Sequence, residues 1–170
     1  MRLAEELGPT KIFALLNDCY ARMGPEIREN GGFVDKYIGD AVMALFPAGP
    51  ASAVRAAVRM QRVLRDASDL VRGRLGIGVH VGPTLLGTLG EPMRFEATVV
   101  SDSVNVAARL QGVAKQIGAS LVVSAEVANA LDAPLLDESR ALFRDGAVQW
   151  ARALFAALCA ESPDDAPMQW

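Results

Sequence analysis

One hairpin-like stretch constrains the fold of this chain more than any other. Residues 33–38 are rich in strand-forming side chains, and residues 41–46 form a short apolar run typical of a buried strand. Gly39 and Asp40 interrupt the apolar character where a turn would fall. The stretch therefore predicts two short strands joined by a tight turn, with Lys36 and Asp40 beside it. A hairpin without any chemical role fits this stretch alone about as well, because short motifs carry a high false-positive rate.

The rest of the chain predicts an alternation of helices and strands. The spacing of its apolar residues changes between the helical period of 3.6 residues and the strand period of 2 residues, and Gly and Pro residues lie at the boundaries. We expect a single folded unit over residues 1–160 and a disordered tail over residues 161–170. Helices are predicted at residues 3–23 (split at Gly8-Pro9), from Ser52 as N-cap, at 103–117 after Ser101 or Asp102 as cap, and at 125–131. Strands are predicted at residues 75–81, 95–100, 121–123, 140–144 and 148–158, with a hairpin arm over 82–92.

The stretch from Leu75 to Val81 alternates apolar residues with Gly76, Gly78 and His80, which is the period of a strand. The glycines leave one face almost bare, so we expect another element to pack closely there. His80 lies on this face. We expect it to be a strand residue with a hydrogen-bond partner rather than a catalytic base, because no second His or Cys lies near it in the sequence.

Composition narrows the class of protein. The 170 residues suit one domain with its own core. The net charge of −3 does not indicate the basic surface that binds nucleic acid or an anionic membrane. The two cysteines, Cys19 and Cys159, are far apart and favour buried thiols of a cytosolic protein over a disulfide. No apolar run approaches the length of a membrane span, and acidic residues stand where a signal peptide would be apolar. We therefore expect a cytoplasmic location, or the cytoplasmic domain of a longer protein.

A second long stretch decides between a plain hairpin and a functional site. Residues 94–110 read Arg-Phe-Glu-Ala-Thr-Val-Val-Ser-Asp-Ser-Val-Asn-Val-Ala-Ala-Arg-Leu. Together with Phe-Val-Asp-Lys-Tyr-Ile-Gly-Asp-Ala-Val-Met-Ala-Leu-Phe at 33–46, this stretch resembles the catalytic signature of class III nucleotidyl cyclases, the adenylyl/guanylyl cyclase domain. The first motif matches nearly throughout, and the second departs at Ser101, where Gly is usual. The resemblance runs from about residue 3 to about residue 124.

The resemblance implies an α+β fold for residues 1–160, with a ferredoxin-like βαββαβ cyclase core. The first strand of that core is missing from this sequence. In the family this strand carries the first of two metal-binding carboxylates, and no residue of this chain can take that role, since Asp18, Asp35 and Glu96 are in the wrong places. This absence leaves two possibilities open: a longer protein that begins upstream with this strand, or a partner chain that supplies the missing carboxylate.

The same resemblance implies the reaction and the residues that perform it. The ribose 3′ oxygen of ATP would attack the α-phosphorus, with two Mg²⁺ or Mn²⁺ ions neutralising charge. Asp40 matches the second metal carboxylate; its alternative role is a turn residue. Lys36 and Thr98 match the two purine-reading positions, with Thr98 typical of one bacterial subgroup. An ammonium can donate to adenine N1 and a hydroxyl can accept from the adenine amino group, so ATP is favoured over GTP.

Asn105 and Arg109 match the residues that orient the ribose and stabilise charge on the α-phosphate. Their i, i+4 spacing puts both on one helical face, and an always-protonated, forked guanidinium suits the second task. Without the motif pair, simpler roles fit: a solvated lysine at 36, a β-branched strand residue at 98, and an amide–guanidinium pair on a helix surface.

In the family, each site lies between two subunits, so a homodimer with two equivalent sites is expected. We interpret the chain as an adenylyl cyclase catalytic domain that converts ATP to cyclic AMP and pyrophosphate. Three alternatives remain: a catalytically degenerate homologue that dimerises as a regulatory module, a fragment of a longer enzyme, and a non-enzymatic scaffold that shares only the fold.

Overall fold

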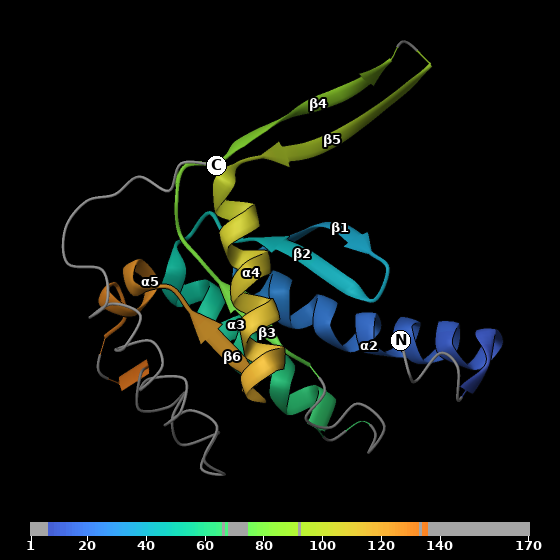
Figure 1. The fold of residues 1–170 in the computed structure, drawn as a ribbon, viewed down its shortest axis with the longest axis horizontal. Helices are drawn as coiled ribbons and strands as arrows, with labels where there is room; N and C mark the ends of the chain where they lie inside the picture. The colour runs from blue at the N-terminus through green and yellow to red at the C-terminus, as the bar shows by residue number, and fades with distance from the viewer. Residues whose placement is uncertain (1–6, 66, 68–74, 92, 133, 136–170) are drawn as a thin grey trace.

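A computed structural model describes residues 7–65, 67, 75–91, 93–132 and 134–135 (Figure 1). The helices and strands follow the predicted order. The predicted hairpin arm contributes one further strand, Leu85–Glu91. The helices are α2 (Pro9–Glu29), α3 (Pro50–Arg65), α4 (Asp102–Ile117) and α5 (Ala125–Asn129), and the strands are β1 (Phe33–Ile38), β2 (Ala41–Leu45), β3 (Ile77–Val79), β4 (Leu85–Glu91), β5 (Arg94–Val100) and β6 (Leu121–Val123).

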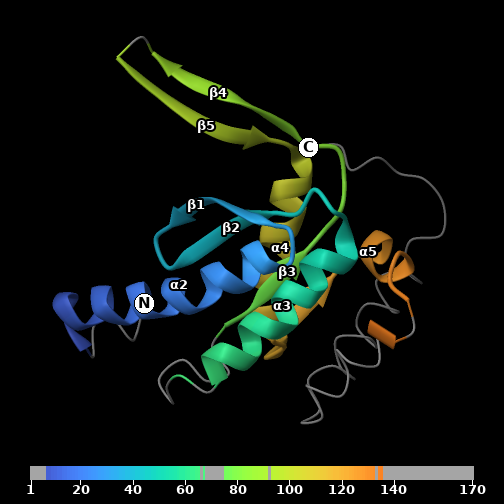
Figure 2. The ribbon, with the colours of Figure 1, turned by 180° about the vertical axis from the view of Figure 1, so that it is seen from behind.

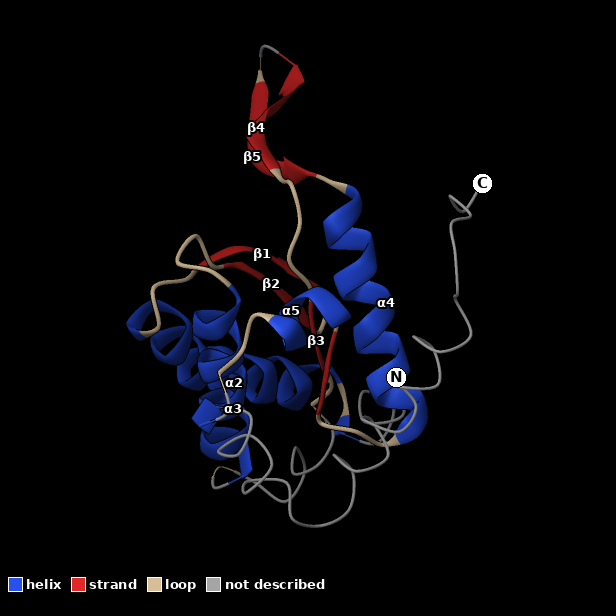
Figure 3. Ribbon diagram, turned by 90° about the vertical axis from the view of Figure 1, so that its left-hand side faces the viewer, coloured by secondary structure: helices blue, strands red, loops and turns tan. Residues whose placement is uncertain are grey.

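The strands of the described chain form three separate pairs. β1 and β2 are an antiparallel hairpin, β3 and β6 are parallel, and β4 and β5 form a long antiparallel arm. Helices α2 and α3 lie on one side of the strands and α4 on the other, while the β4–β5 arm extends beyond the helices (Figure 3). The fold is α+β, as predicted. No strand before α2 is found among the described residues, so β2 and β3 are not joined into one sheet there.

The core lies between the helix pair and the strands. Figure 2 shows α2 and α3 side by side beneath the β1–β2 hairpin. One cluster joins Met23 and Ile27 of α2 to Ala57 and Leu64 of α3, with Val42 packed against it from the hairpin. A second cluster joins α3 to β3 and α5. Helix α3 has a buried face along most of its length and therefore contributes to both clusters.

The glycine face of β3 is covered by α4, as the sequence predicts. A Cβ on Gly78 would lie 2.5 Å from the backbone nitrogen of Gln111 and would also overlap the carbonyl oxygen of Ala107. Only a residue without a side chain allows this approach of strand and helix backbones. Gly78 thus sets the distance between β3 and α4.

Two helix boundaries differ from the prediction. Helix α2 does not end near residue 23 but continues through Pro25 to Glu29, because Ile27 is buried in the core and its packing stabilises the last turn. Ser52 is not the N-cap of α3. The helix begins at Pro50, which suits the first helical position because it has no N–H to lose, and Ser52 lies buried inside the first turn.

Helix α4 begins and ends as its sequence predicts. The hydroxyl of Ser101 accepts a hydrogen bond of 3.0 Å from the backbone N–H of Ser103, and Gly118 ends the helix in the left-handed conformation with φ 68°. The strand predicted at 75–81 is shorter, with β3 at Ile77–Val79. The strands predicted at 140–144 and 148–158 and the tail at 161–170 lie outside the described residues. None of the helices in the described part of the chain is both long and apolar enough to cross a membrane.

Candidate active site

The two predicted purine-reading residues meet in the structure. Lys36 lies on β1 and Thr98 on β5, and Lys36 Nζ donates a hydrogen bond of 2.5 Å to Thr98 Oγ1. Both side chains are half-buried, at the point where the arm contacts the β1–β2 hairpin. Sixty-two positions of sequence separate them, so only the tertiary fold makes them neighbours.

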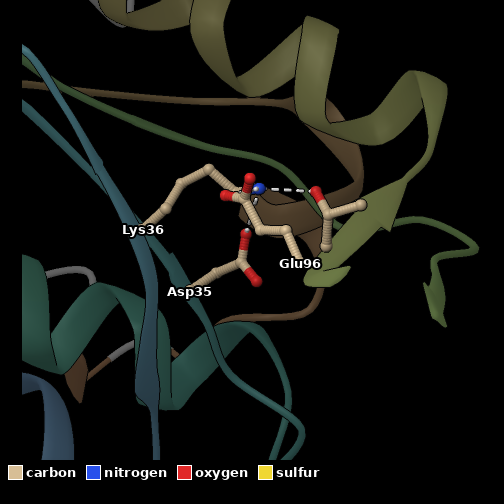
Figure 4. Close-up of polar contacts among 4 residues, drawn as sticks. Asp35, Lys36 and Glu96 are labelled. Carbon is tan, nitrogen blue, oxygen red and sulfur yellow. Dashed lines mark hydrogen bonds and ion pairs between the residues drawn. The ribbon is translucent and has the colours of Figure 1, made fainter. Parts of the chain in front are cut away.

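Two carboxylates accompany Lys36. Its Nζ lies 3.6 Å from Asp35 Oδ2 and 3.6 Å from Glu96 Oε1 (Figure 4). The Asp35 side chain is only 4% exposed, whereas that of Glu96 is 63% exposed. The ammonium therefore lies among three oxygen-bearing side chains from β1 and β5.

Asp40 lies in the turn between β1 and β2, with an exposed side chain. Gly39 precedes it with φ 61°, a conformation that glycine adopts without strain. The carbonyl oxygen of Gly39 accepts a hydrogen bond of 2.7 Å from the hydroxyl of Tyr20 on α2. Burial, and then the negative charge of Asp40, raise the pKa of Tyr20 above its ordinary value. The Tyr20 hydroxyl therefore interacts electrostatically with the Asp40 carboxylate.

Asn105 and Arg109 lie one turn apart on α4 and are both exposed. A single residue, Ser101, separates β5 from α4, so this helix continues directly from the strand that carries Thr98. No hydrogen bond or ion pair among the described residues joins Asp40 or Asn105 to the Lys36–Thr98 pair.

Among the predicted site residues, one side chain is suited to bind the divalent cations that the sequence implies. Asp40 offers an exposed carboxylate, the hard oxygen that Mg²⁺ prefers. Within the described ranges, no group of three or more His, Cys, Asp or Glu side chains is arranged to hold an ion. Mg²⁺ in nucleotide sites is often held by one or two carboxylates together with substrate phosphates. Asp40 fits one such position and does not make a site alone.

His80 has the hydrogen-bond partner that the sequence predicts. Its Nδ1 lies 2.9 Å from the hydroxyl of Ser124, at the end of β6, and 3.7 Å from Glu126. This contact ties β3 to the start of α5. It involves none of the five predicted site residues.

Comparison with known proteins identifies the family. The profile described as "Adenylate and Guanylate cyclase catalytic domain" matches residues 1–148. The chain belongs to the family of adenylate and guanylate cyclase catalytic domains.

Named relatives agree with this assignment. An adenylate cyclase of Anabaena cylindrica is 42% identical over 143 residues, which cover 78% of this chain and 28% of the relative. The terminal-differentiation specific adenylate cyclase of Dictyostelium discoideum is 35% identical over 123 residues, covering 66% of this chain and 6% of that protein. This cyclase domain therefore spans only a small part of the length of these relatives.

Solved structures show the cyclase fold. A bacterial light-regulated adenylyl cyclase superposes with a TM-score of 0.67 at 29% identity, covering 77% of this chain and 41% of that one. A guanylyl cyclase superposes nearly as well, with a TM-score of 0.65 at 28% identity, covering 76% of this chain and 71% of that one. Since both kinds of cyclase match similarly, the overall fold does not distinguish their purines.

Sequence reasoning missed two features of this cyclase site. The sequence analysis excludes Asp35 as the first metal ligand and assigns it no other role, and the alternation of a regular strand would turn Asp35 away from Lys36. Tyr20 was read only as part of the opening helix. A polar aromatic residue facing the core side of that helix was the available signal, but the sequence does not tell which carbonyl it contacts.

Proposed function

We propose that this domain is an adenylyl cyclase, which converts ATP to 3′,5′-cyclic AMP and pyrophosphate. The observation that carries the proposal is the hydrogen bond between Lys36 and Thr98. It joins an ammonium, which can donate to adenine N1, to a hydroxyl, which can accept from the adenine amino group. Guanine presents a donor at N1, so the same pair disfavours GTP. The adenylate cyclase names of the relatives agree with this choice.

The reaction needs positioning and charge stabilisation more than covalent chemistry. The ribose 3′ oxygen forms a bond to the α-phosphorus, the bond to the pyrophosphate oxygen breaks, and a proton is released. Asn105 would hydrogen-bond the ribose, and Arg109 would donate to the α-phosphate oxygens as their negative charge increases. Both groups are exposed on α4, where a substrate can reach them.

Asp40 would hold a divalent cation together with the triphosphate. Two Mg²⁺ or Mn²⁺ ions would supply charge neutralisation at the attacking and leaving oxygens. The ligand contributed by this chain is the Asp40 carboxylate, held in the turn that Tyr20 contacts.

We propose that the domain acts as a homodimer, with sites between the subunits. The support is apolar surface on the arm and hairpin. Phe95 is 66% exposed and Met93 89% exposed, and further large apolar side chains are exposed beside them. Exposed apolar surface of this extent on a small protein commonly marks an interface. The exposed apolar residues on these elements are Phe33, Tyr37, Ile38, Leu85, Leu86, Leu89, Met93, Phe95 and Val100.

The test measures cyclic AMP and cyclic GMP formed by the purified chain from ATP and GTP, with Mg²⁺ or Mn²⁺. We expect activity with ATP only. Asp40→Ala and Lys36→Met should each lower kcat/KM for ATP by at least about a hundredfold, the scale of losing a charge-stabilising group. Asp18→Asn is the control, because it removes a surface carboxylate that forms an ion pair with Arg22 on the same helix.

Three outcomes would contradict the proposal. Equal use of GTP would remove the purine assignment, and activity retained in Asp40→Ala would remove the metal role. Absence of activity in soluble dimers that bind no ATP would leave only a dimerising module.

A further inference from the structure

A β-bulge shapes the strand that carries Lys36. The β1–β2 register pairs Val34 with Ala44 and then Lys36 with Met43, so Asp35 is an extra residue without a partner on β2. Val34 and Ala44 pack toward the core formed by α2 and α3. In a regular strand, Asp35 and Lys36 would point to opposite faces. The bulge re-aims them, and both side chains turn toward β5 (Figure 4).

Asp35 is the buried member of this cluster. Its side chain is 4% exposed, and its Oδ2 accepts no hydrogen bond from any described residue. The nearest described opposite charge is the Lys36 ammonium at 3.6 Å. A buried carboxylate without a hydrogen bond is unfavourable unless a cation compensates its charge. Asp35 therefore attracts Lys36 strongly to one position.

Glu96 lies at the same distance from Lys36 but in a different environment. Its side chain is 63% exposed, and water and salt screen an exposed pair so that it contributes little. Of the two carboxylates, Asp35 is the one able to fix the ammonium. Lys36 has three donors: one bonds Thr98, one faces Asp35, and the third faces the exposed Glu96, which a ligand can displace.

We propose that Asp35 is a positioning residue, which holds the Lys36 ammonium beside Thr98 so that its remaining donor is oriented before the nucleotide arrives. The role deepens the proposed function and rests on Lys36 reading the purine. It adds a residue that touches no substrate and acts through Lys36. Preorganisation of this kind favours binding because the ligand need not order the side chain itself.

The first test does not depend on catalysis. The chain has only three lysines, Lys11, Lys36 and Lys115, so their ¹⁵N-labelled ammonium groups can be resolved by NMR. In the native protein we expect the Lys36 ammonium protons to exchange with water more slowly than those of the other two. Asp35→Asn should abolish this difference, Glu96→Gln should leave most of it, and Asp18→Asn should change nothing. Equal exchange in the native protein and Asp35→Asn overturns the proposal.

The second test separates positioning from a general structural effect. In 1-deaza-ATP a C–H group replaces the N1 acceptor. Asp35→Asn should lower kcat/KM for ATP by about tenfold, mainly through KM, which is the scale of one displaced charge-assisted hydrogen bond. It should lower kcat/KM for 1-deaza-ATP less than about twofold, since no N1 contact remains to be lost. Equal losses with both substrates overturn the proposal and assign Asp35 a merely structural role.

The two proposals can fail separately. If the native chain forms no cyclic AMP while Asp35→Asn still releases the Lys36 ammonium, the proposed function fails and the positioning contact stands. If the native chain is active and Asp35→Asn changes neither the proton exchange of Lys36 nor the discrimination between ATP and 1-deaza-ATP, the positioning role fails and the proposed function stands.

Discussion

The hydroxyl of Tyr20 donates a hydrogen bond of 2.7 Å to the carbonyl oxygen of Gly39. The ring of Tyr20 also contacts that of Tyr37, with the ring centroids 4.4 Å apart. Through these two contacts, helix α2 holds the turn that carries Asp40. The position of the proposed metal ligand thus depends on a residue from the first described helix.

Tyr20→Phe should weaken this support without removing the ring contact. Loss of one partly exposed hydrogen bond should lower the free energy of unfolding by about 0.5 to 1 kcal/mol, measured by urea denaturation. Activity should fall several-fold, with a higher Mn²⁺ concentration needed for half-maximal rate, because the Asp40 turn is less restrained. Tyr37→Phe is the control, since the Tyr37 hydroxyl bonds none of the described residues. Equal effects of the two substitutions would contradict the role of Tyr20.

Gly78→Ala should destabilise the fold strongly. The new methyl group would overlap the backbone of α4 at Ala107 and Gln111, so strand and helix would have to separate. We expect a loss of about 1 to 3 kcal/mol or more in unfolding free energy, as for other overpacked cores. Gly112→Ala on α4 is the matched control, because nothing lies within 4 Å of its Cβ position. It should stabilise the protein by about 0.5 to 1 kcal/mol, and a similar loss from both variants would refute the close-packing argument.

Gln61→Met should expose the role of a buried amide. Gln61 is 7% exposed, and its Nε2 donates hydrogen bonds of 2.9 Å to the carbonyl oxygens of Leu75 and Ser120. It thereby ties α3 to the residues that precede β3 and β6. Its loss should cost about 1 to 3 kcal/mol in thermal or urea unfolding. The same change at exposed Gln116 should cost less than about 0.5 kcal/mol, and equal effects would argue against the amide bridge.

The stability of the protein should depend on the ionisation of Glu126 in acid. A hydrogen bond from Ser124, then one from its own backbone N–H, and more weakly the charge of His80, lower its pKa below the ordinary value of 4.5. The folded protein therefore binds this proton less readily than the unfolded chain. The resulting stability is present above the ordinary pKa and is lost as pH falls through the folded value.

Urea unfolding between about pH 6 and about pH 3 measures this dependence. Glu126→Gln should lose less stability over this range than the native chain. Glu91→Gln, on the exposed arm, should follow the native curve. A Glu126→Gln curve parallel to that of the native protein would show that Glu126 does not contribute.

Local sequence predicted most elements of the described fold. Strand propensity and the Gly39-Asp40 turn predicted the β1–β2 hairpin, and alternation with glycine predicted the contact of β3 with another element. The end of α2 was missed because the burial of Ile27 outweighs the break that Gly24-Pro25 suggests. Helix boundaries of this kind depend on tertiary packing, which local propensity does not contain.

For the candidate site, the sequence by itself identified the side chains that we propose to carry the chemistry. Two motifs supplied Lys36, Asp40, Thr98, Asn105 and Arg109, and their match to the cyclase family is specific because both are long and in order. Such residues can be named from sequence because they match the motifs of the family position by position.

Only the tertiary structure decided how Lys36 is held. Its contact with Thr98 spans 62 positions, and its contact with Asp35 needs a bulge that reverses the normal alternation of a strand. A bulge arises from the pairing of β1 with β2 and leaves no mark on the periodicity of β1. The sequence therefore identified the lysine proposed to read the purine, and the three-dimensional pairing of strands determined the charges around it.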